Sequence, residues 1–356
     1  MNLLLLGWCD FFADAFVPFA QSGLSAARVV VQHRGGYALC SEQGEVTAEV
    51  TGRFRHGAAA TSDFPVVGDW VAIGFLPDED KAVIHAVLPR RSKFSRMAAG
   101  DTTEEQVLAA NIDDVLIVAA LASELNPRRI ERYLTLAGHS GARPGVVLSK
   151  TDLAQDVPGA VASIEKIAPD VPVFAISSTT GDGLEPLRSH LCAGRTAVLL
   201  GPSGVGKSTL INRLCGNDFQ AVQPVRAWDD KGRHTTTCRE LICLPSGGLI
   251  IDTPGLRELQ VWEGETGLGE AFADIENLAA GCRFVNCLHE GEPGCAVRDA
   301  VAAGNLDPAR LESHRKLKRE MAYFERRYDA RAQAQLRRRS KSATKRLRAF
   351  YKVNED

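Results

Sequence analysis

Residues 201–208 read GPSGVGKS, and this stretch decides what kind of fold the chain adopts. It matches the pattern G-x-x-x-x-G-K-[ST], and it follows an apolar, strand-like run at 197–200 and precedes a helical run at 209–215. Glycines allow backbone N–H groups to turn inward onto a phosphate, and the following helix adds the positive end of its dipole. We therefore predict a phosphate-binding loop in an α/β domain, made by Gly201, Pro202, Ser203, Gly204, Val205, Gly206, Lys207, Ser208 and Thr209.

Side chains in and beyond this loop are predicted to handle the γ-phosphate and a magnesium ion. Lys207 would reach the β- and γ-phosphates, which makes it a catalytic candidate, and the Ser208 hydroxyl would ligate Mg²⁺. Asp252 ends an apolar run and would hold Mg²⁺ through water, while the Gly255 N–H would sense the γ-phosphate. Three threonines lie between these motifs, and we favour Thr236 as the one that closes over Mg²⁺.

A second motif predicts which base is bound. Residues 149–152 read SKTD, and Asp152 would accept hydrogen bonds from the guanine N1–H and exocyclic amine, a pair that adenine does not offer. The stem of Lys150 would lie over the base. Ser149 stands where Asn is usual and is a shorter group for bracing the loop. Ser177 and Ser178 are expected to contact guanine O6 through their backbone.

The order of the two motifs is the reverse of the ordinary one, in which the phosphate loop comes first. Apolar strands alternating with helices over 112–260 predict a mostly parallel sheet covered on both faces. The chain therefore has the parts of a GTPase in rotated order. The segment after Gly255 runs toward a later Cys/His cluster, and we hypothesise that γ-phosphate contacts set the orientation of the domain that carries this cluster.

Before this domain, short apolar runs separated by glycine-containing turns predict a small β-barrel over residues 28–96. Spacing alone leaves the type of barrel open. Residues 1–27 form a lead-in segment, which we expect to be a helix packed on a neighbouring domain, with these side chains on one face: Phe11, Phe12, Phe16 and Phe19. A basic exit segment that could lie along a phosphate backbone follows the barrel: Arg90, Arg91, Lys93 and Arg96.

Four potential metal ligands lie close together near the C-terminal end: Cys282, Cys287, His289 and Cys295. Three thiolates and one imidazole match a closed, tetrahedral structural zinc site, and free buried cysteines are the alternative. The other cysteines are scattered, which suits a reducing compartment. The apolar N-terminus lacks a basic region, so we expect no signal peptide and a cytoplasmic protein.

The rotated order, the runs GRHTTT at 232–237 and DTPGL at 252–256, and the Cys/His cluster together resemble the small ribosomal subunit biogenesis GTPases of the RsgA (YjeQ) family. The resemblance implies an α/β multidomain protein. It has an oligonucleotide-binding (OB) type barrel at 28–96, a circularly permuted GTPase domain at 97–265, and a helical zinc domain with a basic tail at 266–356. It also implies hydrolysis of GTP to GDP and phosphate, stimulated by the small ribosomal subunit during late maturation.

Leu256 stands where Ras-like enzymes carry a glutamine that orients water, so the catalytic group must come from elsewhere. His234, in the segment between the two phosphate motifs, is our candidate, and the resemblance supports that role. The alternative is a histidine on a solvated loop, or one that touches RNA. Slow turnover is expected in either case until a partner orders the loop.

The net charge of −2 is near neutral, but the cations of residues 315–352 greatly outnumber the acids. Such a tail suggests a nucleic acid partner, and a solvated helix is the alternative. No run approaches the ~20 apolar residues of a membrane span. Together with the family resemblance, which implies the small subunit and its rRNA as partners, these features lead us to expect a monomer that binds GTP, Mg²⁺ and one zinc ion. Two other functions stay open: an RNA-binding module that keeps GTP as a structural ligand, and a metabolite kinase or ATPase.

Overall fold

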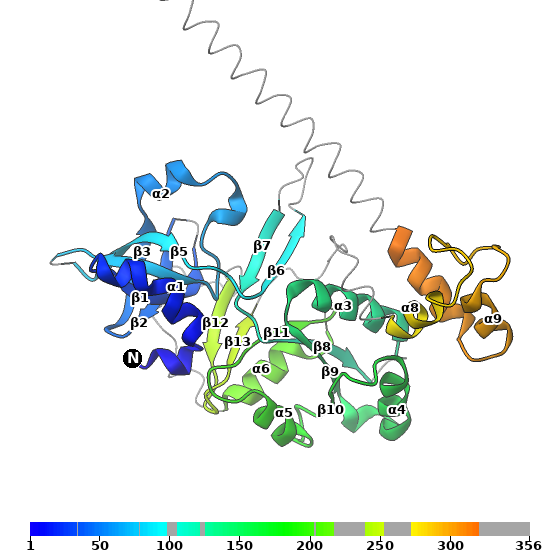
Figure 1. Ribbon diagram of the computed structural model, residues 1–356. Coiled ribbons are helices and arrows are strands. Elements are labelled where there is room, and N and C mark those ends of the chain that lie inside the picture. The colour runs from blue at the N-terminus through cyan, green and yellow to red at the C-terminus, as the bar shows by residue number, and fades with distance from the viewer. Residues whose placement is uncertain are drawn as a thin grey trace, which may run out of the picture.

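The computed structural model describes residues 1–33, 35–77, 79–97, 105–121, 125–202, 204–216, 239–252 and 272–319. Figure 1 shows a barrel on one side, an α/β domain in the middle and a small helical domain on the other side. Ser203, His234, Thr236, Gly255 and the chain beyond residue 319 lie outside the described residues. Every helix within the described ranges is too short or too polar to traverse a lipid bilayer.

Five strands form a closed barrel. Its order is β1-β2-β3-β5-β4, β4 pairs again with β1, and only the β3–β5 pair is parallel. Inward-facing residues such as Val29, Leu39 and Ile84 are fully buried. This is an OB-type barrel, as the family resemblance implied. Its elements are β1 (Ser25–Gln32), β2 (Tyr37–Ser41), β3 (Gly44–Val50), α2 (Gly52–Gly57), η2 (Thr61–Asp63), β4 (Trp70–Phe75) and β5 (Lys81–Val87).

The N-terminal segment, residues 1–24, packs between the barrel and the α/β domain. It contains the 3-10 turn η1 (Leu3–Leu6) and helix α1 (Asp10–Gln21). Phe12 is buried against Trp70 of the barrel, with ring centroids 5.8 Å apart, whereas Phe11 is exposed. Gly7 has a φ of +83°, and a Cβ there would lie 2.7 Å from the Gly194 carbonyl oxygen of the α/β domain. Only glycine allows so close an approach.

The α/β domain is built on a six-stranded sheet in the order β10-β9-β8-β11-β13-β12, parallel except for β12. Alternating side chains of its strands face opposite ways: Leu116 packs with α5 and α6, and Ile117 with α3 and α4. The predicted sheet with helices on both faces is confirmed. Its elements are β8 (Asp114–Ala120), α3 (Pro127–Ser140), β9 (Arg143–Ser149), η3 (Thr151–Leu153), α4 (Val157–Ile167), β10 (Val173–Ala175), α5 (Leu184–His190), β11 (Thr196–Leu200), α6 (Lys207–Cys215), β12 (Arg239–Cys243) and β13 (Leu249–Asp252).

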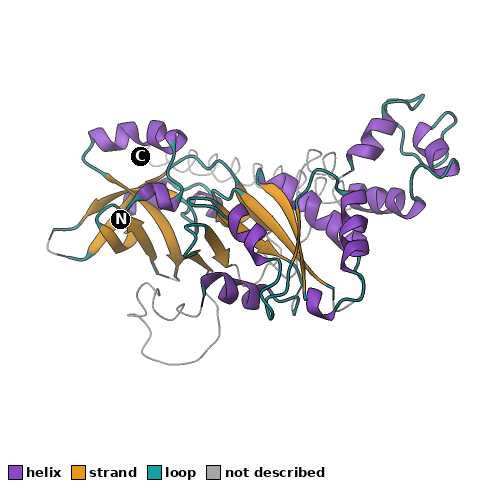
Figure 2. Cartoon of the chain, turned by 90° about the horizontal axis from the view of Figure 1, so that it is seen from below, coloured by secondary structure: helices purple, strands orange, loops and turns teal. Residues whose placement is uncertain are grey.

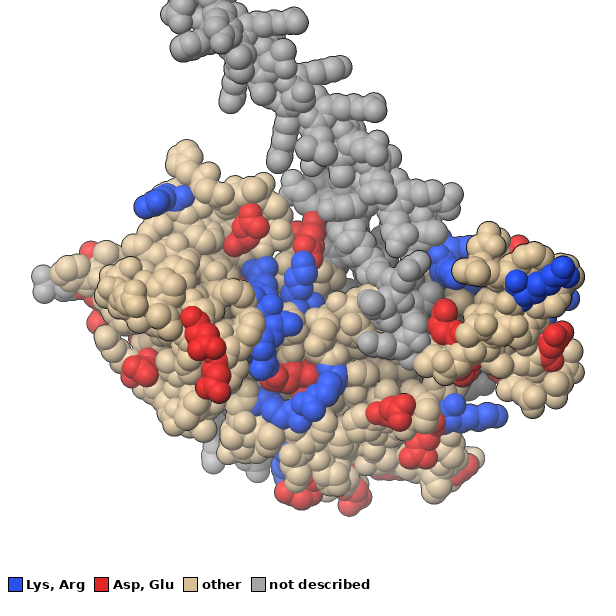
Figure 3. Space-filling model, in the orientation of Figure 1, with Lys and Arg blue, Asp and Glu red and all other residues tan. Residues whose placement is uncertain are grey.

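A hairpin that the sequence did not predict joins the barrel to this domain: β6 (Lys93–Met97) and β7 (Glu105–Ala110). It changes the interpretation of the basic exit segment. Arg90 turns inward and binds the buried Asp69 through two hydrogen bonds of 2.7 and 2.8 Å, and Lys93 lies 2.6 Å from Glu105. Figure 3 shows basic and acidic side chains side by side near the middle of this face. Arg90 is therefore a structural cation.

The barrel and the α/β domain share one strand. Edge strand β12 pairs with β13 on one side and with β1 of the barrel on the other, where Gln32 lies opposite Arg239. The two sheets thereby become one continuous sheet of eleven strands. Figure 2 shows these strands in orange, with the helical domain at the opposite end of the molecule from the barrel.

The helical domain, called here the Cys/His domain, spans the described residues 272–319. It contains α8 (Ala273–Ala279), α9 (Ala296–Ala302) and a helix that covers 308–319. Phe272, Ile275 and Val297 are fully buried.

One buried arginine holds the three N-terminal parts together. Arg28, 1% exposed, donates to the carbonyl oxygens of Leu6 in the N-terminal segment, Gly68 in the barrel and Asn111 at the entry to the α/β domain. Burial lowers its pKa to about 10, so the guanidinium stays charged at neutral pH. Hydrogen bonds to carbonyl oxygens and the face of Trp70, 5.6 Å away, surround this charge.

We expect Arg28→Met to lower the free energy of unfolding by about 2–4 kcal/mol, because the Leu6 and Asn111 oxygens lose a buried donor. Urea unfolding of the full chain measures the change. Arg53→Met, at an exposed position of α2, is the matched control and should change little. Equal stability of the two variants would contradict the role given to Arg28.

Candidate nucleotide site and metal centre

The phosphate loop has the predicted local structure. It connects β11 to α6, and Gly201, Gly204 and Gly206 all have positive φ. At Gly201 a Cβ would lie 2.3 Å from the Val118 carbonyl oxygen, so the loop needs glycine there to lie against β8. The Lys207 ammonium folds back over the loop and donates to the carbonyl oxygens of Gly201 and Pro202, at 2.6 and 2.8 Å. If Lys207 binds the nucleotide as predicted, phosphate oxygens would replace these carbonyl oxygens as its hydrogen-bond acceptors.

Residues 149–152, called here the base-reading segment, lie directly against the phosphate loop, although they precede it in the sequence. The Ser149 hydroxyl donates to the Val205 carbonyl oxygen at 2.6 Å, and the Lys150 ammonium donates to the Gly204 carbonyl oxygen at 2.8 Å. Lys150 has a φ of +60°, which turns the chain at the end of β9. Ser149 thus braces the phosphate loop despite its short side chain. The two motifs form one site.

Sheet topology explains why they meet. β9 and β11 lie on either side of β8, and all three are parallel. The strand order reverses at this point, and the loops after parallel strands form a crevice there, where ligands bind in open α/β sheets.

Asp152 has a partner that the sequence did not predict. The Ser177 hydroxyl donates to its carboxylate at 2.6 Å, so Ser177 holds the predicted guanine-reading carboxylate through its side chain. The loop is held further by the Thr180 N–H, which donates to the Ser177 hydroxyl, and by Gly181 N–H, which donates to the Ser177 carbonyl oxygen. Ser178 follows in the same loop and is half-buried.

The predicted magnesium side is described in part. Ser208 and Thr209 lie exposed in the first turn of α6, and Asp252 ends β13, where it lies opposite Glu240 of β12. Their roles in binding the ion stay predictions.

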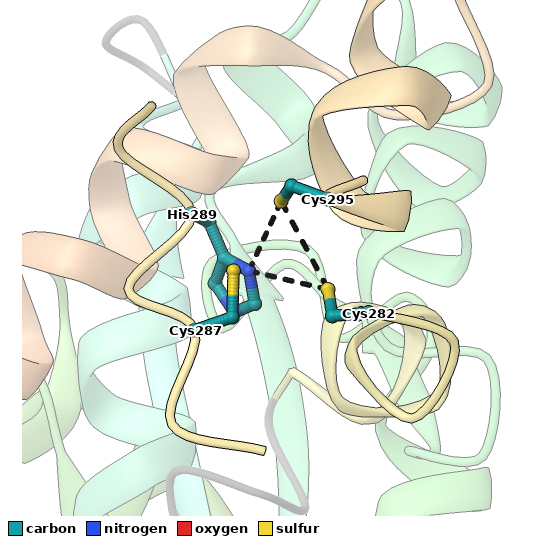
Figure 4. A group of neighbouring side chains, drawn as sticks. All are labelled: Cys282, Cys287, His289 and Cys295. Carbon is teal, nitrogen blue, oxygen red and sulfur yellow. Dashed lines mark hydrogen bonds between the residues drawn. The ribbon is translucent and has the colours of Figure 1, made fainter. Parts of the chain in front are cut away.

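The four predicted metal ligands come together in the Cys/His domain, with all ligand atoms within 4.8 Å of one another. Figure 4 shows them pointing to a common centre. The sulfurs of Cys282 and Cys295 are 3.9 Å apart, and they lie 3.7 and 3.4 Å from the Nδ1 atom of His289. A tetrahedral zinc with ordinary bond lengths places two sulfurs about 3.8 Å apart and sulfur and nitrogen about 3.5 Å apart. The group therefore fits one structural zinc ion.

The backbone around these ligands prepares them for a cation. Burial raises the pKa of Cys282, but hydrogen bonds from the N–H groups of Val297 and Ala296, at the start of α9, and from the Cys295 and Cys287 side chains together lower that pKa below its ordinary value. Burial lowers the pKa of His289, which favours the neutral imidazole that a metal requires. The sequence did not reveal Glu292, whose carboxylate accepts from the N–H groups of Leu288, Glu290 and Gly291 and so folds the loop that carries His289. These hydrogen bonds lower the pKa of Glu292 to about 2.

Comparison with known proteins agrees with this geometry. The model of the RsgA GTPase family matches residues 87–262. The small ribosomal subunit biogenesis GTPase RsgA of Opitutus terrae is 50% identical over 338 residues, which are 92% of each chain. The chain belongs to the RsgA GTPase family. The protein of the same name from Streptomyces coelicolor is 44% identical over 342 residues, 94% of this chain and 91% of that one.

Solved structures show the same fold. The crystal structure of YjeQ from Thermotoga maritima has a TM-score of 0.63 and 28% identity, and the match covers 84% of this chain and 99% of that one. YloQ, described as a circularly permuted GTPase, has a TM-score of 0.62 and 24% identity, with 84% and 95% covered. The rotated motif order is therefore a circular permutation, as predicted. Membership of this family makes the chain a GTPase with GTP and GDP as its nucleotides.

If Ser149 braces the phosphate loop, Ser149→Ala should weaken GTP and GDP binding alike, by about fivefold, because one neutral hydrogen bond is lost. Ser149→Asn, with the residue usual in GTPases, should bind at least as tightly as the original chain. Titration with a fluorescent guanine nucleotide measures both. Ser163→Ala removes a hydroxyl from α4 and is the control. Unchanged affinity in Ser149→Ala would show that the bond contributes nothing.

For the metal centre, the purified chain should contain one zinc ion, and Cys295→Ser should lose most of it. Atomic absorption gives the zinc content. Cys192→Ser changes an exposed cysteine outside the group and should keep the metal. A full complement of zinc in Cys295→Ser would remove this residue from the ligand set.

Proposed function

We propose that the chain binds the small ribosomal subunit late in its maturation, hydrolyses GTP to GDP and phosphate when the subunit stimulates it, and then dissociates. The observation that carries the proposal is the pair of hydrogen bonds from Ser149 and Lys150 to the phosphate loop, which lets both motifs contact a single guanine nucleotide. The printed names of the relatives support the ribosomal role.

The chain's own residues bind and orient the nucleotide. Asp152, held by Ser177, accepts hydrogen bonds from the guanine, and the backbone N–H groups of 201–206 surround the β-phosphate. Lys207 exchanges its carbonyl partners for the β- and γ-phosphate oxygens. Ser208, Thr236 and, through water, Asp252 would hold Mg²⁺, which neutralises charge on the β- and γ-phosphates. The Gly255 N–H would donate a hydrogen bond to the γ-phosphate and so distinguish GTP from GDP.

His234 is proposed to orient the attacking water, because the side chain of Leu256 has no hydrogen-bonding group. In this reading the free enzyme is slow, and the subunit accelerates it by ordering the segment that contains His234.

The barrel, the Cys/His domain and the basic tail are the proposed contacts to rRNA, and the protein would work as a monomer in the cytoplasm. OB-type barrels commonly bind nucleic acid strands. One structural zinc ion would hold the Cys/His domain, which has a small core of its own.

Leu256 favours one other function, an RNA-binding module that keeps GTP as a structural ligand. Measuring phosphate release with and without small subunits distinguishes a GTPase from a module that keeps GTP as a structural ligand. Asp152 argues against a kinase or ATPase, and competition between GTP and ATP tests that point.

The deciding experiment measures GTP hydrolysis with and without purified small subunits, for the original chain and for His234→Ala. We expect subunits to accelerate the original chain, and His234→Ala to reduce the stimulated rate by about 100-fold. Nucleotide affinity, measured in parallel, should stay the same in the variant. A chain that subunits do not stimulate would overturn the assigned function, whereas an unchanged stimulated rate in His234→Ala would only remove His234 from catalysis.

A further inference from the structure

The Cys/His domain is fastened to the GTPase domain at helix α3, by residues that are far apart in the sequence. Arg310 donates to the Glu131 carboxylate at 2.7 Å, and Arg128 donates to the Asp307 carboxylate at 2.8 Å. Figure 1 shows α8 of the Cys/His domain beside α3. Both bonds cross from one domain to the other.

The central charge pair is buried. The Glu131 side chain is 0% exposed and that of Arg310 is 9% exposed. Arg310 also lies over the ring of Phe272, 4.8 Å from its centroid. Charges taken out of water in this way are strongly destabilising if one partner is lost and the other is left alone.

Each of the two buried groups, however, has a second partner within its own domain. Glu131 accepts from Arg128, one turn earlier in α3, at 3.0 Å. Arg310 donates through Nε and Nη2 to the two carboxylate oxygens of Asp274, both at 2.8 Å. If the domains separated, Glu131 would keep Arg128 and Arg310 would keep Asp274. Among the described residues, separation breaks the two crossing bonds named above, but it leaves neither Glu131 nor Arg310 without a partner.

We propose that these residues form a reversible latch, which holds the Cys/His domain against α3 in one orientation and releases it in another without unfolding either domain. In the same helix, Ile130 and Leu134 pack on β9, the strand that ends at Ser149. In the latched state, the position of the Cys/His domain is therefore fixed relative to residues 149–152, which begin at the end of β9. This differs from the hypothesis based on the sequence, which placed control in the segment after Gly255; residues 253–271 lie outside the described residues.

The latch makes opposite predictions for two equivalent substitutions. Glu131→Gln weakens the crossing bond and favours release. Asp274→Asn weakens an Arg310 bond that exists in both states, but it also removes a negative charge that shares Arg310 with Glu131, and therefore repels Glu131, only when the domains are latched. It therefore favours the latched state. Both changes replace a carboxylate by an amide of the same shape, one on each side of the joint.

Hydrogen exchange on the full, zinc-loaded chain tests the latch. For each variant, the exchange rate is measured in the domain that does not carry the substitution. Glu131→Gln should speed exchange of residues 306–319 by about tenfold. Asp274→Asn should slow exchange of α3, residues 127–140. Exchange at 306–319 that is unchanged in Glu131→Gln, or at α3 that is unchanged or faster in Asp274→Asn, would overturn the latch.

Asp307→Asn covers the case in which Glu131→Gln does not fold. Asp307 is on the surface, with a side chain 61% exposed, and its substitution weakens the second crossing bond, while the Asn oxygen can still accept from the Ala309 N–H. It should speed hydrogen exchange of α3 by less than the tenfold expected at residues 306–319 for Glu131→Gln. No change there, with the chain folded as judged by its melting temperature, would likewise contradict the proposal. None of these measurements requires ribosomal subunits, so the latch can fail while the assigned function stands.

Discussion

The arrangement of the N-terminal segment, the barrel and the GTPase domain depends on how the chain satisfies one buried arginine. Arg28 lies in a barrel strand among valines, and its guanidinium binds three backbone oxygens from three different parts of the chain. A buried charge is tolerated only when its donors are used, so the N-terminal segment, the barrel and the start of the GTPase domain must meet at this point. The GTPase sheet then continues directly from the barrel through β12.

The circular permutation leaves the two predicted nucleotide motifs adjacent, because their positions depend on which strands are neighbours. β8 lies between β9 and β11 whichever of them the chain reaches first. The side chains of Ser149 and Lys150 then join the two loops, and the short Ser149 side chain reaches because its hydroxyl oxygen lies 2.6 Å from the Val205 carbonyl oxygen. Permutation instead moves the chain ends, and with them the points at which the barrel and the Cys/His domain are attached.

Motifs with local chemistry could be predicted from the sequence. The phosphate loop, the SKTD segment and the four metal ligands each depend on spacing over a few residues, and the barrel prediction depends on short apolar runs separated by glycine-containing turns. Contacts between distant residues could not be predicted. Nothing near Arg90 in the sequence shows that Asp69 will neutralise it, and Glu131 and Arg310 are 179 positions apart. The β6–β7 hairpin was missed because its first strand is rich in cations and lacks an apolar run.

Because its edge strand β12 pairs with β1 of the closed barrel, the GTPase half of the eleven-stranded sheet is incomplete by itself. The GTPase domain separated from the barrel would present the backbone of β12 as an open edge, with Arg239 and Glu240 no longer paired to β1. Open edges of this kind recruit strands from other molecules. The barrel therefore also protects the GTPase domain from self-association, and a shortened protein intended for crystallography or biosensing would need a substitute cap along that strand.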